Sequence, residues 1–332
     1  MTEEILRATE LTGIFGRSEL DKLEEILGEE WVTYRNSYES AAGLNLSQFP
    51  IQLDIELNAS CNLKCPMCPI SAESPKGKGP QTWFNFDLYK RIINYAYQQG
   101  TRALKLNYVN EPLIRKDLVK FISYAKEVGM VDVYLSTNGV LLTEKFSYDL
   151  IGSGLTRIQI SIDATTSEIY EKMRPGGDYD KVISNISKFL SLRAELKKAI
   201  PLVRVNFVKT EINEHQLDEF IDLWKNKVEM VGVQEFIKPT KSSLEIKSLK
   251  SIDKRKSGFK CSFPFKQLVI NNELDVLPCC TFWGEELKLG KLTKPEDLKE
   301  FWNNELIQNI RRLHLAGKYY EIPQCKLCVE GK

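Results

Sequence analysis

The feature that most constrains the fold is a regular alternation of strand-like and helix-like runs from Ile51 onward. Six short β-rich runs predict strands at residues 51–57, 103–108, 131–136, 157–162, 202–208 and 232–237. Stretches with apolar residues near helical spacing separate them, at residues 88–99, 118–128, 144–151, 179–193 and 216–225. Such alternation indicates βαβ units and a parallel sheet. Six units are fewer than the eight of a closed barrel, so we predict an α/β fold with an open, partial (β/α)6 TIM-like barrel. Functional residues are expected at the C-terminal ends of its strands.

The segments around this barrel predict four parts of the chain. Residues 1–50 read as an amphipathic, helical N-terminal extension, and residues 51–240 form the barrel. Residues 241–257 are polar and basic, which is typical of a solvated linker. Residues 258–332 predict a small C-terminal domain. Its expected elements are a hairpin (Lys266–Ile270, a turn at Asn271-Asn272, Leu274–Leu277) and a helix near residues 295–313.

Charge and cysteine content limit the possible partners and sites. The net charge of +1 gives no electrostatic reason to expect nucleic acid or an anionic membrane as a partner. No apolar run approaches the roughly 18 residues of a membrane span, and the N-terminus is polar and acidic, so we expect a cytoplasmic protein. In a reducing compartment the eight cysteines favour metal binding or catalysis over disulfides. Only His215 and His314 exist, so a histidine-rich metal site is excluded.

Three cysteines follow the first predicted strand directly, in the run Cys61-Asn-Leu-Lys-Cys65-Pro-Met-Cys68. Thiolates are the usual ligands of iron–sulfur clusters, and three of them on a four-iron cluster leave one iron open. A structural zinc site would need four ligands, and no fourth lies nearby. This CxxxCxxC pattern, at this position in a βα repeat, resembles that of the radical S-adenosylmethionine (SAM) superfamily.

The resemblance implies a cofactor and a chemistry. SAM would bind the open iron of a [4Fe–4S] cluster through its amine and carboxylate. An electron from a donor such as flavodoxin or ferredoxin would lead to its cleavage. The resulting 5′-deoxyadenosyl radical would remove a hydrogen atom from a substrate, while the protein orients and shields the reaction.

Further positions of this family's motifs occur near the ends of the next three predicted strands. Glu111 resembles the family's acidic residue beside the methionine amine, although Asn110 replaces a glycine. Arg174 resembles the arginine that holds the SAM carboxylate, a role suited to its two-pronged guanidinium. Taken singly, each position also fits a cap, a turn or a surface ion pair. Together they predict a SAM site made by Asn110, Glu111, Ser136, Asn138, Ser161, Asp163 and Arg174.

The C-terminal cysteines form a second group. Alone they also fit a zinc ribbon. Beside a radical SAM core they resemble a shortened SPASM (twitch-like) domain with one auxiliary [4Fe–4S] cluster. The predicted ligands are Cys261, Cys279, Cys325 and Cys328, which leaves Cys280 unused. A spare cysteine is often a small buried hydrophobe. The run Pro278-Cys279-Cys280 also resembles that of SPASM-related epimerases, in which the second cysteine returns a hydrogen atom to the substrate radical.

Several functions remain open at this point. The first is epimerisation of a small polar substrate, such as a sugar, aminosugar or aminocyclitol, with Cys280 as the catalytic hydrogen donor. The second is dehydrogenation, with the auxiliary cluster accepting the second electron. Modification of a peptide, of the kind found in ribosomally made peptide natural products, is a third. A zinc-binding module without enzymatic activity is the remote alternative.

Overall fold

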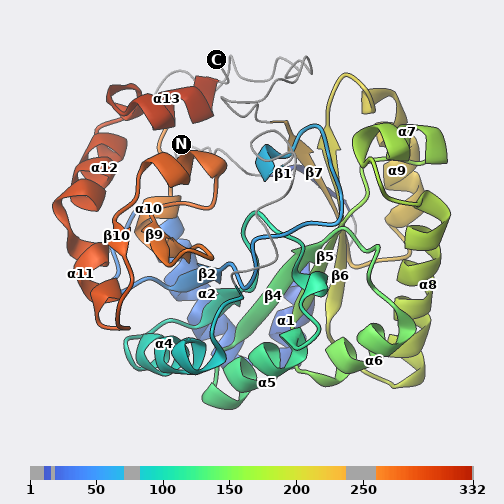
Figure 1. Ribbon diagram of the computed structural model, residues 1–332, viewed down its shortest axis with the longest axis horizontal. Helices are drawn as coiled ribbons and strands as arrows, with labels where there is room; N and C mark the ends of the chain where they lie inside the picture. The colour runs from blue at the N-terminus through green and yellow to red at the C-terminus, as the bar shows by residue number, and fades with distance from the viewer. Residues whose placement is uncertain (1–10, 16–18, 71–82, 237–258, 331–332) are drawn as a thin grey trace.

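The computed structural model describes residues 11–15, 19–70, 83–236 and 259–330. A single ten-stranded sheet forms its centre, in the order β1-β7-β6-β5-β4-β3-β2-β8-β9-β10 (Figure 1). The middle strands β2 to β7 all run parallel to one another. They are β2 (Gln52–Ile55), β3 (Ala103–Lys105), β4 (Asp132–Thr137), β5 (Arg157–Ser161), β6 (Leu202–Lys209) and β7 (Met230–Glu235). The six predicted strands and their parallel arrangement are therefore confirmed.

Helices cover the outer face of this curved sheet, as the alternating strand pattern requires (Figure 1). Leu53 and Ile55 of β2 pack into the main hydrophobic core with these helices, whereas Gln52 and Asp54 lie on the inner side and hydrogen-bond to each other at 2.6 Å. The inside of the barrel is thus polar and its outside apolar. The helices are α4 (Phe86–Gln98), α5 (Leu118–Val128), α6 (Glu144–Gly152), α7 (Ser167–Met173), α8 (Tyr179–Glu195) and α9 (Leu217–Trp224).

The C-terminal segment extends the same sheet instead of forming a separate one. β8 (Gln267–Ile270) pairs parallel with β2, and β9 (Asp275–Leu277) returns antiparallel to it, which confirms the predicted hairpin. β10 (Gly290–Lys291) completes the edge. Helices α10 (Phe263–Lys266), α11 (Asp297–Asn303), α12 (Glu305–Leu315) and α13 (Pro323–Glu330) surround these strands.

The single helix predicted near residues 295–313 is in fact two. Asn304 has an extended backbone between α11 and α12 (φ −69°, ψ 163°). Its side chain accepts a hydrogen bond from the backbone N–H of Ile307 at 3.0 Å and donates one to the carbonyl of Leu289 at 3.0 Å. Asparagine is a strong N-cap residue, so it starts a new helix here.

Contrary to the prediction, the N-terminal segment is not wholly helical. Leu11–Phe15 forms strand β1. β1 pairs antiparallel with β7 and covers what would otherwise be an exposed sheet edge. The helical part of the prediction is confirmed by α1 (Glu19–Leu27) and α2 (Glu29–Ala42). The predicted linker at residues 241–257 lies outside the described residues.

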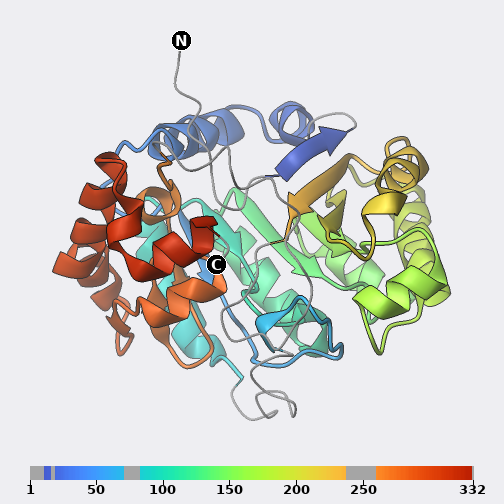
Figure 2. The ribbon, with the colours of Figure 1, turned by 90° about the horizontal axis from the view of Figure 1, so that it is seen from above.

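Helices α1 and α2 lie across one end of the barrel (Figure 2). Trp31 and Tyr34 pack with Ala103 and Leu202, which begin β3 and β6. The Tyr34 hydroxyl also donates to the Asp132 carboxylate, at 3.3 Å. The N-terminal ends of the strands are therefore closed by α2, and the interior is left open at the opposite end. No described helix has the length and apolar character needed to cross a membrane.

We expect Trp31→Ala to lower the free energy of unfolding by about 3–5 kcal/mol, because it empties the site of a large buried ring. The neighbouring Val32 provides a matched control, since its side chain is 36% exposed while that of Trp31 is 1% exposed. Val32→Ala should change stability by no more than about 0.5 kcal/mol. Urea unfolding followed by far-UV circular dichroism measures both, and equal losses would contradict the packing described for α2.

Candidate active site

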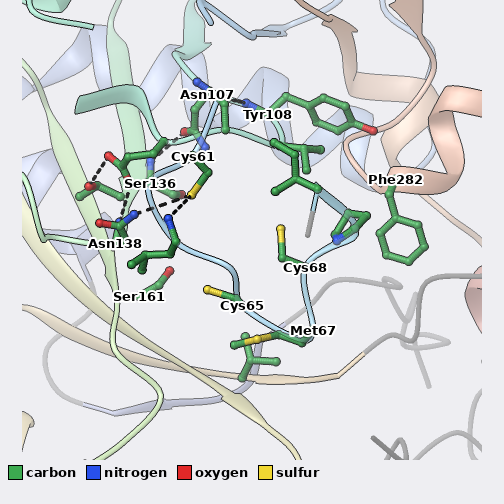
Figure 3. A pocket seen from close by; sticks show the side chains of 18 of the residues that line it. Cys61, Cys65, Met67, Cys68, Asn107, Tyr108, Ser136, Asn138, Ser161 and Phe282 are labelled. Carbon is green, nitrogen blue, oxygen red and sulfur yellow. Dashed lines mark hydrogen bonds between the residues drawn. The ribbon is translucent and has the colours of Figure 1, made fainter. Parts of the chain in front are cut away.

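A cavity of about 380 Å³ lies at the open end of the barrel, where the strands have their C-terminal ends. All three cysteines of the 61–68 loop line it, and their sulfur atoms surround one open space (Figure 3). Of the predicted SAM-site residues, six line the same cavity: Asn110, Glu111, Ser136, Asn138, Ser161 and Arg174. Residues far apart in the chain are thus brought together at the strand ends.

Neighbouring elements hold the cysteine loop in place. Asn138 donates from its side-chain amide to the Cys61 sulfur at 3.9 Å and to the Asn62 side chain at 2.9 Å. Arg174 donates to the Cys65 sulfur at 3.8 Å. Burial raises the pKa of Cys61 to about 11 and that of Cys65 to about 12, although Arg174 partly opposes the rise at Cys65. Metal binding must therefore displace the thiol protons.

Glu111 acts as a buried connector between two strand ends. Its carboxylate accepts from the backbone N–H of Asn138 at 2.8 Å, the Thr137 hydroxyl at 2.7 Å and the N–H of Leu113 at 3.0 Å. Burial raises the pKa of this carboxyl, and these hydrogen bonds oppose the rise. Glu111 therefore shapes the cavity wall between β3 and β4.

Asp163 differs from the other predicted SAM-site residues, because it does not line the cavity. Its carboxylate lies behind Arg174, pairs with that guanidinium and accepts from the backbone N–H of Val208 at 2.7 Å. A backbone φ of 65°, in the left-handed region that aspartate tolerates better than most residues, turns the side chain this way. These contacts suit Asp163 to the positioning of Arg174, and its predicted direct contact with the cofactor stays a prediction.

The guanidinium of Arg174 is buried, and its two terminal nitrogens contact Cys65 and Asp163. Its Nε has no hydrogen-bond partner among the described residues, and the residue lines the cavity. Burial lowers its pKa, but Asp163 and Cys65 raise it more, so the group stays charged. A charged guanidinium of this kind fits a carboxylate such as that of SAM.

Ser136 and Asn110, two further predicted SAM-site residues, form hydrogen bonds between the ends of neighbouring strands. Ser136 donates from its hydroxyl to the Gln159 side chain at 3.1 Å, and its backbone N–H donates to the Asn107 side chain at 2.8 Å. Asn110 donates to the Asn58 side chain at 2.8 Å and accepts from the N–H of Tyr108 at 3.0 Å. These contacts join the ends of β2, β3 and β4.

A second, smaller cavity lies among the C-terminal elements, and four cysteines line it among largely apolar residues. Cys261, Cys279, Cys325 and Cys328 line it, together with His314. Burial raises the pKa of each of these four thiols. A β-carbon on Gly284 would lie 2.7 Å from the Cys279 carbonyl oxygen and 3.2 Å from its sulfur, so only glycine leaves room there. The donor set fits a four-thiolate iron–sulfur cluster.

Cys280 lines the first cavity and not the second, whereas its neighbour Cys279 does the reverse. Burial raises the pKa of Cys280 to about 12, so its thiol keeps its proton. Thr281 lines both cavities, and its carbonyl accepts from the buried Tyr108 hydroxyl at 2.8 Å. The two sites therefore meet at residues 279–281.

Among the described residues, no three histidine, cysteine, aspartate or glutamate side chains lie close enough together to hold a single metal ion. In a four-iron cluster each thiolate binds a different iron, which spaces the ligands more widely than around one ion.

The sequence alone did not point to Tyr108 or His314 as site residues. Tyr108 lies next to a predicted motif, but its partner Thr281 is 173 residues away. His314 lies on α12 and accepts a hydrogen bond from the backbone N–H of Cys261, which is 53 residues away. Neither contact has a local sequence pattern, because each depends on how the C-terminal elements pack.

Known protein families match both the barrel and the C-terminal segment of the chain. Residues 55–225 match the radical SAM superfamily, and residues 261–329 match SPASM, an iron–sulfur cluster-binding domain. Curated relatives include a "Probable GTP 3',8-cyclase" of Methanococcus maripaludis, 30% identical over 184 residues, and one of Methanococcus vannielii, 32% identical over 186 residues. Each match covers 55% of this chain, which spans 58% of the length of either relative.

Solved structures with the same fold include BtrN in complex with AdoMet and 2-DOIA (19% identity, TM-score 0.51), with 84% of this chain and 92% of that chain covered. Streptococcus suis SuiB bound to S-adenosylmethionine is also similar (19% identity, TM-score 0.62), with 85% and 72% covered. Native anSMEcpe with AdoMet and the Kp18Cys peptide gives 17% identity and a TM-score of 0.60, with 80% and 83% covered.

We expect Asp163→Asn to lower the free energy of unfolding by on the order of 3 kcal/mol, because it leaves the buried charge of Arg174 without its partner. Glu168→Gln is the matched control, since it removes an exposed ion pair with Lys172 on the adjacent helix α7 and should have little effect. Urea unfolding of both variants, with cluster content equalised, makes the comparison. A stable Asp163→Asn protein would refute the positioning role.

Proposed function

This chain belongs to the radical SAM superfamily and carries a SPASM iron–sulfur domain, and on this premise we propose that it epimerises a small polar substrate, with Cys280 as hydrogen donor. The observation that carries the proposal is the separation of two adjacent cysteines. Cys280 lines the cavity of the three-cysteine loop, and Cys279 lines the cavity of the other C-terminal cysteines.

In this proposal Cys61, Cys65 and Cys68 hold the first [4Fe–4S] cluster. When bound, that cluster and SAM supply a 5′-deoxyadenosyl radical, which removes a hydrogen atom from a substrate carbon. Arg174 lines the cavity and stays charged, so it is the candidate partner of the SAM carboxylate. Asn110, Glu111, Ser136, Asn138 and Ser161 provide the polar wall against which SAM is oriented.

Cys280 then completes the proposed reaction from the other face of the substrate. Its S–H bond breaks homolytically, a new C–H bond forms, and the carbon is left with inverted configuration. The sulfur radical that remains needs one electron and one proton to return to the thiol. An external donor such as flavodoxin or ferredoxin supplies the electron, and the second cluster on Cys261, Cys279, Cys325 and Cys328 lies on the route.

The lining of the cavity is largely apolar, but the polar side chains within it support a substrate with hydroxyl or amino groups, such as a sugar, aminosugar or aminocyclitol. Asn107 and Gln234 line the cavity with the residues named above. Their side-chain amides can both donate and accept hydrogen bonds. Amide and carboxylate groups recognise hydroxyl-rich ligands through hydrogen bonds of this kind.

Dehydrogenation is the second candidate, because Thr281 lines both cavities and brings the second cluster site next to the substrate space. In that reaction the substrate radical loses a proton and passes one electron to the cluster. Peptide modification and the cyclisation named for the curated relatives are further outcomes that the assays below separate by product.

Anoxically reconstituted protein should contain about eight iron atoms per chain, four for each cluster. With SAM and a reductant it should form 5′-deoxyadenosine, detected by liquid chromatography. A Cys65→Ala variant should lose this product, since it lacks one ligand of the open cluster. Equal 5′-deoxyadenosine from both proteins would overturn the assignment of the first cluster.

The Cys280→Ala variant should still cleave SAM and retain its iron, but its epimerisation of candidate substrates should fall by at least about 100-fold, as expected for loss of an essential reacting group. Wild-type enzyme in deuterated water should place one solvent deuterium on the inverted carbon, detected by mass spectrometry and NMR.

Cys279→Ala is the contrasting variant, because it should lose about half of the iron, that of the second cluster. A fully active Cys280→Ala protein would end the epimerase proposal. A product lighter by two hydrogen atoms would establish dehydrogenation in its place.

A further inference from the structure

His314 is buried among the C-terminal cysteines, and the proposed reaction does not use it. It lies near the end of α12, is 1% exposed, and lines the second cavity with the four cysteines. The chain has only one other histidine, His215, which is exposed on the short helix Glu214–Gln216. An imidazole at this position therefore calls for an explanation of its own.

The hydrogen bonds of His314 determine which ring nitrogen carries the proton. The backbone N–H of Cys261 donates to Nδ1 at 3.1 Å. A backbone amide can only donate, so Nδ1 must act as an acceptor without a proton. The ring proton of the neutral imidazole then resides on Nε2, and Nε2 lies 3.4 Å from the sulfur of Cys325. The N–H bond is thus directed at a predicted cluster ligand.

The surrounding packing keeps the ring in this orientation. Phe259 contacts the imidazole edge to face, with ring centroids 6.4 Å apart. One turn earlier on α12, Arg311 donates to the carbonyls of Pro264 at 2.8 Å and Trp302 at 2.6 Å. These bonds fix α12 against α11 and against α10, the helix that begins two residues after Cys261. The imidazole therefore bridges two of the four cysteines, Cys261 and Cys325, from a rigid support.

We propose that His314 is a positioning residue that donates a hydrogen bond from Nε2 to the Cys325 sulfur of the second cluster and so raises the reduction potential of that cluster. Reduction adds negative charge, which spreads onto the ligand sulfurs. A donor at a sulfur stabilises the reduced cluster more than the oxidised one. The inference rests on the second cluster being bound by Cys261, Cys279, Cys325 and Cys328, but not on the identity of the substrate.

The consequence for function is a cluster that accepts an electron more readily. In the epimerase it would be reduced by the external donor before it restores the Cys280 thiol. In a dehydrogenase it would take the electron of the substrate radical. The same hydrogen bond therefore serves either reaction, which keeps this inference independent of the choice between them.

The test measures the potential of the second cluster alone. Full-length protein with Cys61, Cys65 and Cys68 all changed to alanine keeps only that cluster, and a redox titration monitored by electron paramagnetic resonance gives its midpoint. In this background His314→Leu should shift the equilibrium about tenfold against reduction, which is about 59 mV for one electron. His314→Gln, which retains an N–H donor, should recover part of the shift. His215→Leu is the matched control and should leave the potential unchanged. An unaltered potential in His314→Leu would overturn the proposal.

A second measurement needs no change at His314 and remains valid if its variants fail to assemble a cluster. Pulsed electron paramagnetic resonance on the reduced cluster, in protein labelled with 15N only in histidine, should detect one weakly coupled nitrogen. It should also detect one exchangeable proton close to the cluster. Persistence of the nitrogen signal in the His215→Leu protein assigns it to His314, since the sequence has no other histidine. A strong coupling typical of direct iron ligation, or no coupling at all, would refute the hydrogen bond. Absence of any second cluster in the triple-alanine protein would instead refute the ligand set of the proposed function.

Discussion

Strand β2 hydrogen-bonds to β3 on one side and to β8 on the other, and this double pairing determines where both sites lie. The three-cysteine loop leaves the C-terminal end of β2, and the Cys279-Cys280 segment follows the hairpin that β8 begins. Because β8 is parallel to β2, Asp54 lies in register with Val269, and the antiparallel return of β9 places Leu277 opposite Val269. The Cys279-Cys280 segment therefore begins close beside β2, the strand from which the cysteine loop continues. Without this pairing, the sheet would not place Cys280 beside the first cavity.

Buried polar contacts then hold the barrel strands and the C-terminal segment together. The Glu56 carboxylate accepts from the backbone N–H of Val109 at 3.2 Å and from that of Asn272 at 3.0 Å, so one side chain ties β2 to the loop after β3 and to the turn of the hairpin. Tyr108 reaches from the same loop to the Thr281 carbonyl. Buried polar groups are costly unless they are paired, so contacts of this kind specify one arrangement of the barrel strands and the C-terminal segment over others.

The polar interior follows from the same architecture. In a parallel barrel covered by helices, alternate strand residues must be apolar to pack outward, and the remaining ones face the inside. Here α2 closes the N-terminal end through Trp31 and Tyr34, which leaves access from the end that carries the cysteine loop. A reaction that uses a radical benefits from such a site, because the protein can surround the reacting groups on most sides.

Much of this protein was predictable from local pattern. The six parallel strands, the hairpin at Asn271-Asn272 and the radical SAM and SPASM character follow from periodicity and from cysteine spacing, which are properties of short segments. The tertiary structure alone decided that β8 joins β2, that Leu11–Phe15 covers the edge at β7, and that Asp163 supports Arg174 from behind. It also decided that Cys279 and Cys280 line different cavities and that His314 meets Cys325. These outcomes depend on contacts between residues far apart in the chain, whose partners are selected by packing and by the pairing of buried polar groups, and no local pattern encodes that choice.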